Sequence, residues 1–176
     1  MKGYHDSKTP ESIRDLWRTP KALFDYYDRR FNFSCDFAAS HTNHLCDHYF
    51  SAPDENGEGG ALGASAEDGC FADVGGVWCN PPYSDISPWV SECVRLSYET
   101  CKVFVMLLPA DTSVKWFKLA FENCTECHFI SGRIAFINEE TGKPVSGNNK
   151  GSVVFVFDPN SPIKKAVSLI DRDSMK

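Results

Sequence analysis

Apolar and polar positions along the chain predict helices and strands in alternation. A helix is expected over residues 20–30, because Pro20 suits a first helical turn and Thr19 can act as its N-cap. Residues 31–39 alternate weakly and predict a strand that ends at Asp36. The first two elements expected in the fold are therefore a helix and then a strand.

The middle of the chain holds its most apolar segments. Residues 76–79 lie between a Gly-Gly pair and an Asn-Pro-Pro sequence, which predicts a short buried strand. A helix is expected over residues 87–100, where Pro88 occupies a first-turn position. Residues 102–108 give the clearest buried strand, and Pro109 stops it.

The C-terminal half continues the alternation. A helix is expected over residues 114–123 with Thr112 or Ser113 as its cap, followed by two strand-like runs within 127–137 and a last strand over 151–157. Polar, turn-rich segments that predict loops cover residues 51–69 and 138–151. This order predicts an α/β fold whose sheet ends in an antiparallel pair of strands.

The length of 176 residues suits one compact domain. We expect that domain to span residues 16–176 and to follow a polar N-terminal arm over residues 1–15. No stretch approaches the roughly 20 apolar residues of a membrane helix, and the polar, acidic N-terminus does not resemble a secretory signal. These features predict a cytoplasmic protein without a membrane partner.

Eight cysteines are spread along the chain. Disulfide scaffolds are usually shorter and exported, and several of these cysteines lie in apolar runs, so we expect buried or half-buried thiols. Cys124, Cys127 and His128 have the spacing of covalent haem attachment, and the cysteine pair could also form half of a zinc site with histidines of residues 41–48. Haem attachment requires export, so we favour a helix end that leads into a strand and expect no metal.

The net charge of −6 argues against a protein that coats nucleic acid. The charge is uneven, because residues 1–94 carry 7 basic and 15 acidic side chains whereas residues 95–176 carry 11 and 9. Any phosphate contact is therefore expected from a local patch in the C-terminal half, with modest non-specific affinity for DNA.

The sharpest chemical motif is Asn80-Pro81-Pro82-Tyr83, directly after the strand predicted at 76–79. Ligands of open α/β sheets bind beyond the carboxyl ends of strands. A plain Asn-Pro turn is the alternative, but the strand before the motif and the helix after it favour a binding site.

The residue types of this motif suit methylation of a planar amine. The Asn80 side-chain oxygen and the Pro81 carbonyl can accept hydrogen bonds from the two N–H groups of such an amine. Pro82 holds the Pro81 carbonyl in place. Tyr83 offers a flat face on which a base can stack. Positioning would supply most of the catalysis, and a base within a duplex would have to flip out at a cost of roughly a few kcal/mol.

The chain resembles the phage-type DNA N6-adenine methyltransferases over about residues 16–158. The segments that carry this resemblance, in the order and spacing of the family, are 16–20 (LWRTP), 31–40 (FNFSCDFAAS), 77–83 (VWCNPPY), 105–110 (VMLLPA) with Trp116-Phe117, and 152–157. The resemblance implies a Rossmann-like, S-adenosyl-L-methionine-dependent methyltransferase sheet. It also implies transfer to the N6 amino group of a flipped-out adenine in DNA, with the Asn-Pro-Pro-Tyr loop as the catalytic motif. We expect a monomeric or weakly associating enzyme.

The resemblance further implies which residues bind the cofactor. The matching positions are Trp17, Thr19, Pro20, Asp36, Ala38 and Ala39. The turn after Asp36 lacks the glycines that are common in the wider superfamily, and alanine allows close backbone approach less freely. The acid that would bind the ribose is not obvious, and Asp47 and Asp73 are both considered.

A DNA-contacting element is expected around the loop at 138–151. Lysine and arginine can hold phosphates, and asparagine can read adenine edges. The residues expected to bind DNA are Arg133, Lys143, Asn148, Asn149 and Lys150, with Lys115 and Lys118 as further backbone contacts. An ordinary polar hairpin is the alternative.

Other functions stay open at this point. The motif also tolerates cytosine N4 in DNA, adenine in RNA or a glutamine amide in a protein as the methylated amine. A rival of a different class is a non-catalytic nucleic-acid-binding module with the same fold, which the glycine-free turn leaves open.

Overall fold

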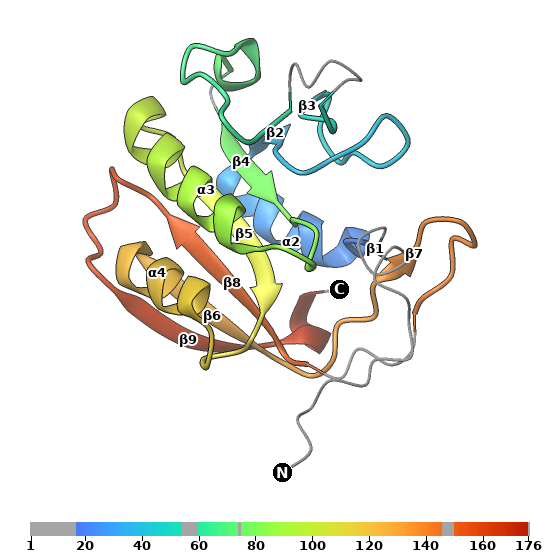
Figure 1. Cartoon of the computed structure of the whole chain (residues 1–176). Coiled ribbons are helices and arrows are strands. Elements are labelled where there is room, and N and C mark those ends of the chain that lie inside the picture. Colours follow the sequence, from blue (N-terminus) through green and yellow to red (C-terminus); the bar gives the residue numbers. More distant parts are fainter. Residues whose placement is uncertain (1–16, 54–59, 74, 146–149, 176) are drawn as a thin grey trace.

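A computed structural model describes residues 17–53, 60–73, 75–145 and 150–175 of the chain. Its main feature is a mixed, mainly parallel seven-stranded sheet with helices on both faces (Figure 1). The arm predicted over residues 1–15 and the predicted DNA-binding residues Asn148 and Asn149 lie outside the described residues. The predicted α/β class is confirmed.

The order of strands in the large sheet is β3-β2-β4-β5-β8-β6-β9. Their bounds are β2 Phe33–Asp36, β3 His48–Tyr49, β4 Gly76–Cys79, β5 Phe104–Pro109, β6 Glu126–Ser131, β8 Ser152–Phe157 and β9 Ala166–Asp171. Strands β3, β2, β4 and β5 run parallel to one another, and β9 runs parallel to β6. Strand β8 runs antiparallel to both β5 and β6.

Helices cover both faces of the sheet, which is why its central strands are apolar on both sides. Helix α2 (Lys21–Phe31) lies on one face, and α3 (Ser87–Thr100) and α4 (Lys115–Asn123) lie on the other (Figure 1). The alternation within β4 shows the division, because Trp78 belongs to the core under α2 whereas Val77 and Cys79 belong to the core under α3. Among the described residues, no helix is long and apolar enough to cross a membrane.

A separate two-stranded antiparallel sheet joins distant parts of the chain. Strand β1 (Trp17–Arg18) pairs with β7 (Ile137–Asn138), so that Trp17 lies opposite Asn138. Two short 3-10 helices, η1 (Gly69–Phe71) and η2 (Arg172–Met175), complete the described elements. The pairing of β1 with β7 brings the N-terminal segment to the same end of the molecule as the 138–145 turn.

Two predicted helix caps are wrong. Pro20 is the N-cap residue of α2, and no side chain caps that helix. The Thr19 side chain is buried instead. Helix α4 begins after Val114 without a side-chain cap, because Ser113 donates its hydrogen bond to Asp111 at 2.5 Å.

The C-terminal end of the sheet also differs from the prediction. Strands β6 and β8 form the expected antiparallel pair, but β9 follows them and becomes the edge of the sheet. Its residues are half-exposed or exposed, so it lacks the continuous apolar run that marks a buried strand.

Three of the eight cysteines are not the buried or half-buried thiols that the apolar runs around several of them predict. Cys35 of β2 and Cys70 of η1 form a disulfide, because the fold brings η1 against β2. Cys101 is exposed at the end of α3, where it adopts a left-handed conformation with φ 54°. The other five are buried free thiols.

Candidate active site

A cavity of about 300 Å³ lies beyond the carboxyl ends of β2 and β4. Parallel strands end at the same edge of a sheet, so the residues that follow β2 and β4 come together there. The predicted site residues that line the cavity are Trp17, Thr19, Asp36, Ala38, Ala39, Asn80 and Pro82. The fold thus gathers residues from three separate predicted segments around one hollow.

Asn80 directly follows β4 and lines this cavity. Its side-chain Oδ1 is buried and has no hydrogen-bond partner among the described residues. Buried polar atoms are nearly always paired, so an unpaired acceptor on a residue that lines a cavity suggests a place for a donor from a ligand. Pro81 is buried behind it, and Pro82 lines the cavity.

Tyr83 is half-buried and is held from both sides. Its hydroxyl donates to the Leu107 carbonyl at 3.4 Å, and its ring meets Phe136 edge-on with centroids 6.0 Å apart. Burial raises the pKa of Tyr83 far above its usual value, so the hydroxyl stays protonated. Tyr83 is not among the residues that line the cavity.

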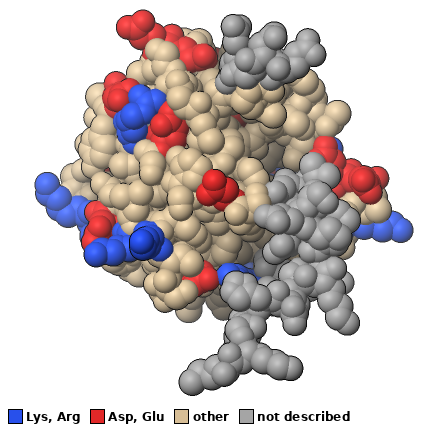
Figure 2. Space-filling model, in the orientation of Figure 1, with Lys and Arg blue, Asp and Glu red and all other residues tan. Residues whose placement is uncertain are grey.

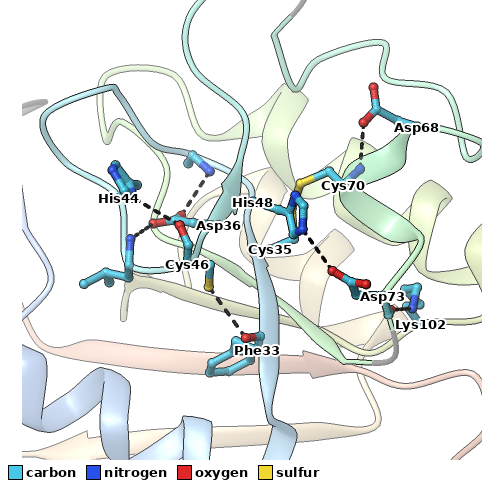
Figure 3. Close-up of a disulfide and its surroundings, with 12 residues drawn as sticks. Phe33, Cys35, Asp36, His44, Cys46, His48, Asp68, Cys70, Asp73 and Lys102 are labelled. Atoms are coloured by element: carbon cyan, nitrogen blue, oxygen red, sulfur yellow. Dashed lines mark hydrogen bonds and ion pairs between the residues drawn. A yellow bond between two sulfur atoms is a disulfide. The ribbon is translucent and has the colours of Figure 1, made fainter.

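Asp36 is the last residue of β2 and is only 4% exposed. Its carboxylate accepts backbone hydrogen bonds from Leu45 at 3.0 Å and Ala38 at 3.4 Å (Figure 3). Burial raises the pKa of Asp36 to about 6, although both hydrogen bonds lower it. A buried carboxylate at the edge of a cavity favours a ligand that brings a donor or a positive charge.

Trp17 reaches the cavity through the pairing of β1 with β7. Its ring stacks on Phe136 with centroids 5.8 Å apart and an interplanar angle of 21°. Its indole Nε1 is buried without a partner among the described residues. Trp17 and Asn80 both line the cavity, and each carries a buried polar atom without a partner among the described residues.

The polar residues of the cavity that were not predicted include Glu139 and Asn43. Glu139 accepts hydrogen bonds from Arg18 at 3.1 Å and from the Thr42 hydroxyl at 2.8 Å, and Asn43 lies on the loop between β2 and β3. Glu139 reaches the cavity only because β7 pairs with a strand more than a hundred residues earlier. No local pattern marks either residue, although Asn43 lies close to the predicted Asp36 segment.

Other residues expected to bind the cofactor lie outside the lining of this cavity. Asp73 forms an ion pair with Nε2 of His48 at 3.0 Å, away from the cavity lining (Figure 3). Asp47 is exposed, and Pro20 is the N-cap of α2. None of these three residues lines the cavity.

The described residues expected to bind DNA differ in their surroundings. Lys150 pairs with Asp111 at 2.8 Å, and this pair helps to lower the pKa of Asp111 to about 2. Arg133 and Lys143 are exposed. On the face shown in Figure 2, basic side chains occur in small separate groups, several beside acidic ones.

The spacing of Cys124, Cys127 and His128 does not produce a metal centre in the described residues. Cys127 points into the core under α3 and α4, whereas His128 points toward α2 and contacts Tyr27 at 3.2 Å. Among the described residues, no group of three or more histidine, cysteine or acidic side chains could hold a metal ion.

Comparison with known proteins identifies the family. The family model described as DNA N-6-adenine-methyltransferase (Dam) matches residues 6–176. A DNA N-6-adenine-methyltransferase of Escherichia phage T1 is 36% identical over 174 residues, covering 88% of this chain and 67% of the relative. One of Haemophilus phage HP1 (strain HP1c1) is 36% identical over 160 residues, covering 89% and 86%. The chain therefore belongs to the DNA N-6-adenine-methyltransferase (Dam) family.

Proposed function

We propose that the protein transfers a methyl group to the N6 amino group of adenine in DNA, and that it does so in the cavity beside Asn80. Membership of the family supports the activity. The observation that carries the site is the Asn80 Oδ1 atom, which is buried and unpaired among the described residues. A buried acceptor without a donor is costly, and the amino group of adenine is a suitable donor.

The cavity residues fit S-adenosyl-L-methionine, the methyl donor that the family implies. When bound, this cofactor supplies an electrophilic methyl group on a sulfonium centre. Asp36 would accept a hydrogen bond from a hydroxyl or amino group, and Trp17 would donate one from its indole N–H. Apolar walls from Leu45, Phe50 and Trp89 suit the flat part of a nucleoside.

The remaining cofactor contacts follow from the lining of the cavity. Thr19 is buried there and is not used to cap α2, so its hydroxyl is placed for a ligand. Ala38 and Ala39 allow backbone to approach the cofactor after Asp36. This arrangement beyond the carboxyl ends of parallel strands supports a Rossmann-like methyltransferase sheet, with residues 16–176 as a single methyltransferase domain.

The catalytic contribution of the loop is the orientation of the amine. Asn80 Oδ1 and the Pro81 carbonyl accept its two N–H groups, which favours a pyramidal nitrogen whose lone pair is free to attack. The prolines stiffen the loop, so little reorganisation is needed as charge develops. Tyr83 is held by Leu107 and Phe136, and we assign its ring to stacking against the flipped base.

Labelled S-adenosyl-L-methionine offered with duplex DNA tests this proposal. We expect the label in N6-methyladenine after digestion of the DNA and chromatography of its nucleosides. Label in N4-methylcytosine would identify cytosine as the substrate instead of adenine. Transfer only to RNA or to a protein amide would identify that molecule as the substrate. Cofactor binding with no transfer to any of them would instead indicate a non-catalytic module.

A further inference from the structure

The outer edge of β9 is an unpaired strand edge. Strand β9 pairs with β6 on one side, and no described strand pairs with its other side (Figure 1). Edge strands usually carry proline, inward charges or lysine that prevent pairing. The strand reads Ala-Val-Ser-Leu-Ile-Asp, without proline or lysine, and Val167 and Leu169 are 55% and 73% exposed.

The ladder with β6 determines which backbone groups of β9 point outward. Ala166 donates to the Thr125 carbonyl at 2.8 Å, so Ala166, Ser168 and Ile170 direct their backbone groups toward β6. In a parallel ladder the residues between them direct theirs away. Val167 and Leu169 therefore present backbone donors and acceptors to the outside.

The same register places the exposed apolar side chains on one face. Val167 lies beside Cys127 and Leu169 lies beside Phe129, and both of these β6 residues belong to the core side under α4. Val167 and Leu169 thus continue that apolar surface past the part of the sheet that α4 covers.

We propose that two copies of the chain pair antiparallel through β9, about a twofold axis that passes at Ser168. This register places Val167 opposite Leu169 of the partner subunit, and the two residues exchange two backbone hydrogen bonds in each symmetry-related pair. The result is a dimer whose two sheets form one continuous sheet. The proposal departs from the monomer expected from the sequence, and it does not depend on the proposed methyl transfer.

The charges at the two ends of β9 favour a second copy over an unrelated peptide. Lys165 directly precedes the strand, and its ammonium lies over the Phe121 ring and donates to the Phe121 carbonyl within the same chain. Asp171 ends the strand. In the proposed register Lys165 lies opposite Asp171 of the partner subunit, once at each end. A shift of two residues in one direction would instead place Val167 opposite that aspartate, so charge and apolar character select the same register.

Site-specific cross-linking of the full chain tests the register. Facing residues of a pair without backbone hydrogen bonds have Cα atoms about 4.5 Å apart, which a disulfide can bridge. In the Ser168→Cys variant, two introduced thiols are oxidised to one disulfide while one molecule of glutathione disulfide is reduced to two thiols. We expect a dimer on a non-reducing gel that dithiothreitol removes.

The matched control is Lys164→Cys, because this register places position 164 opposite position 172 rather than opposite itself. It should give no more dimer than the wild-type chain, which already exposes Cys101. A Ser168→Cys chain that stays monomeric, or a control that cross-links equally well, would overturn the proposal.

Sedimentation velocity tests the dimer without a covalent link. We expect the wild-type chain to shift from monomer to dimer as its concentration rises, and Leu169→Lys to abolish the shift. Tyr98→Lys changes another exposed apolar residue, 57% exposed on α3, and should dimerise like the wild type. A wild-type monomer at every soluble concentration, or a Leu169→Lys chain that dimerises normally, would contradict the pairing.

Discussion

The charge state of Asp36 is expected to control cofactor affinity. Its pKa of about 6 is above the ordinary value, so the folded protein holds this proton at a pH where an unfolded chain has lost it. Stability therefore falls as pH rises from about 4 to about 6. A cofactor that binds the ionised carboxylate binds more tightly across the upper part of the same range.

Titration calorimetry with S-adenosyl-L-methionine checks this dependence. For the wild type, we expect affinity to increase as pH rises through about 6 and then to level off. The Asp36→Asn variant should bind more weakly at pH 7.5 and lose this pH dependence. The same pH profile in both proteins would show that another group is responsible.

Two variants of Tyr83 distinguish the role of its ring from the role of its hydroxyl. Tyr83→Phe removes one long hydrogen bond to Leu107 and should cost about 1 kcal/mol or less in stability, with methyl transfer retained. Tyr83→Ala removes the stacking surface and should weaken binding of the flipped base by roughly 1–3 kcal/mol. Steady-state kinetics with duplex DNA measures both variants, and a Tyr83→Phe enzyme without activity would contradict this assignment.

Among the elements, β2 and η1 are linked by the Cys35–Cys70 disulfide, and the chain near each cysteine contributes residues to the cavity lining. Cys35 adjoins Asp36 (Figure 3), and Cys70 follows Ala61 and Leu62, which line the cavity. The bridge spans 35 positions of the chain, and a loop of this size is typically worth about 2–4 kcal/mol. Its reduction is therefore expected to loosen this part of the proposed cofactor site.

Urea denaturation with and without dithiothreitol measures this effect. We expect the reductant to lower the free energy of unfolding of the wild type by about 2–4 kcal/mol and to weaken cofactor binding. A double variant, Cys35→Ser with Cys70→Ser, should show the lower free energy of unfolding and the weaker cofactor binding both with and without dithiothreitol. An unchanged wild-type protein after confirmed reduction would show that the bridge contributes nothing.

Elements determined by local pattern could be predicted, whereas contacts between distant segments could not. Proline at a first-turn position was enough to predict α3. An apolar run bounded by turns was enough to predict β4 and the loop that follows it. The pairing of β1 with β7 joins residues about 120 positions apart, and no local pattern encodes it. Glu139 was missed for this reason, and the disulfide was missed because it depends on the placement of η1 against β2.

At the scale of the whole molecule, charge limits how the protein binds DNA. The net charge is −6, and Lys150 is paired with Asp111. Few phosphates can then be neutralised, and the logarithm of affinity should fall with the logarithm of salt concentration with a slope shallower than about −4. Fluorescence anisotropy with a labelled duplex measures this slope.

Two lysines provide an internal comparison for the same measurement. Lys143→Ala removes an exposed cation and should reduce the slope by about 1 if Lys143 contacts a phosphate. Lys150→Ala should change the slope less, because Asp111 already neutralises that charge. A steep slope in the wild type, or a larger effect at Lys150, would indicate a DNA surface different from the one inferred.

The proposed methyl transfer depends on Asn80, which is expected to hold the amine that receives the methyl group. Single-turnover transfer of labelled methyl to adenine in DNA, measured beside cofactor affinity for the wild type and Asn80→Ala, tests it most directly. We expect Asn80→Ala to lose transfer by at least about 100-fold, as for removal of one preorganised polar contact, with cofactor affinity largely preserved. Transfer by Asn80→Ala at a rate close to that of the wild type would contradict it.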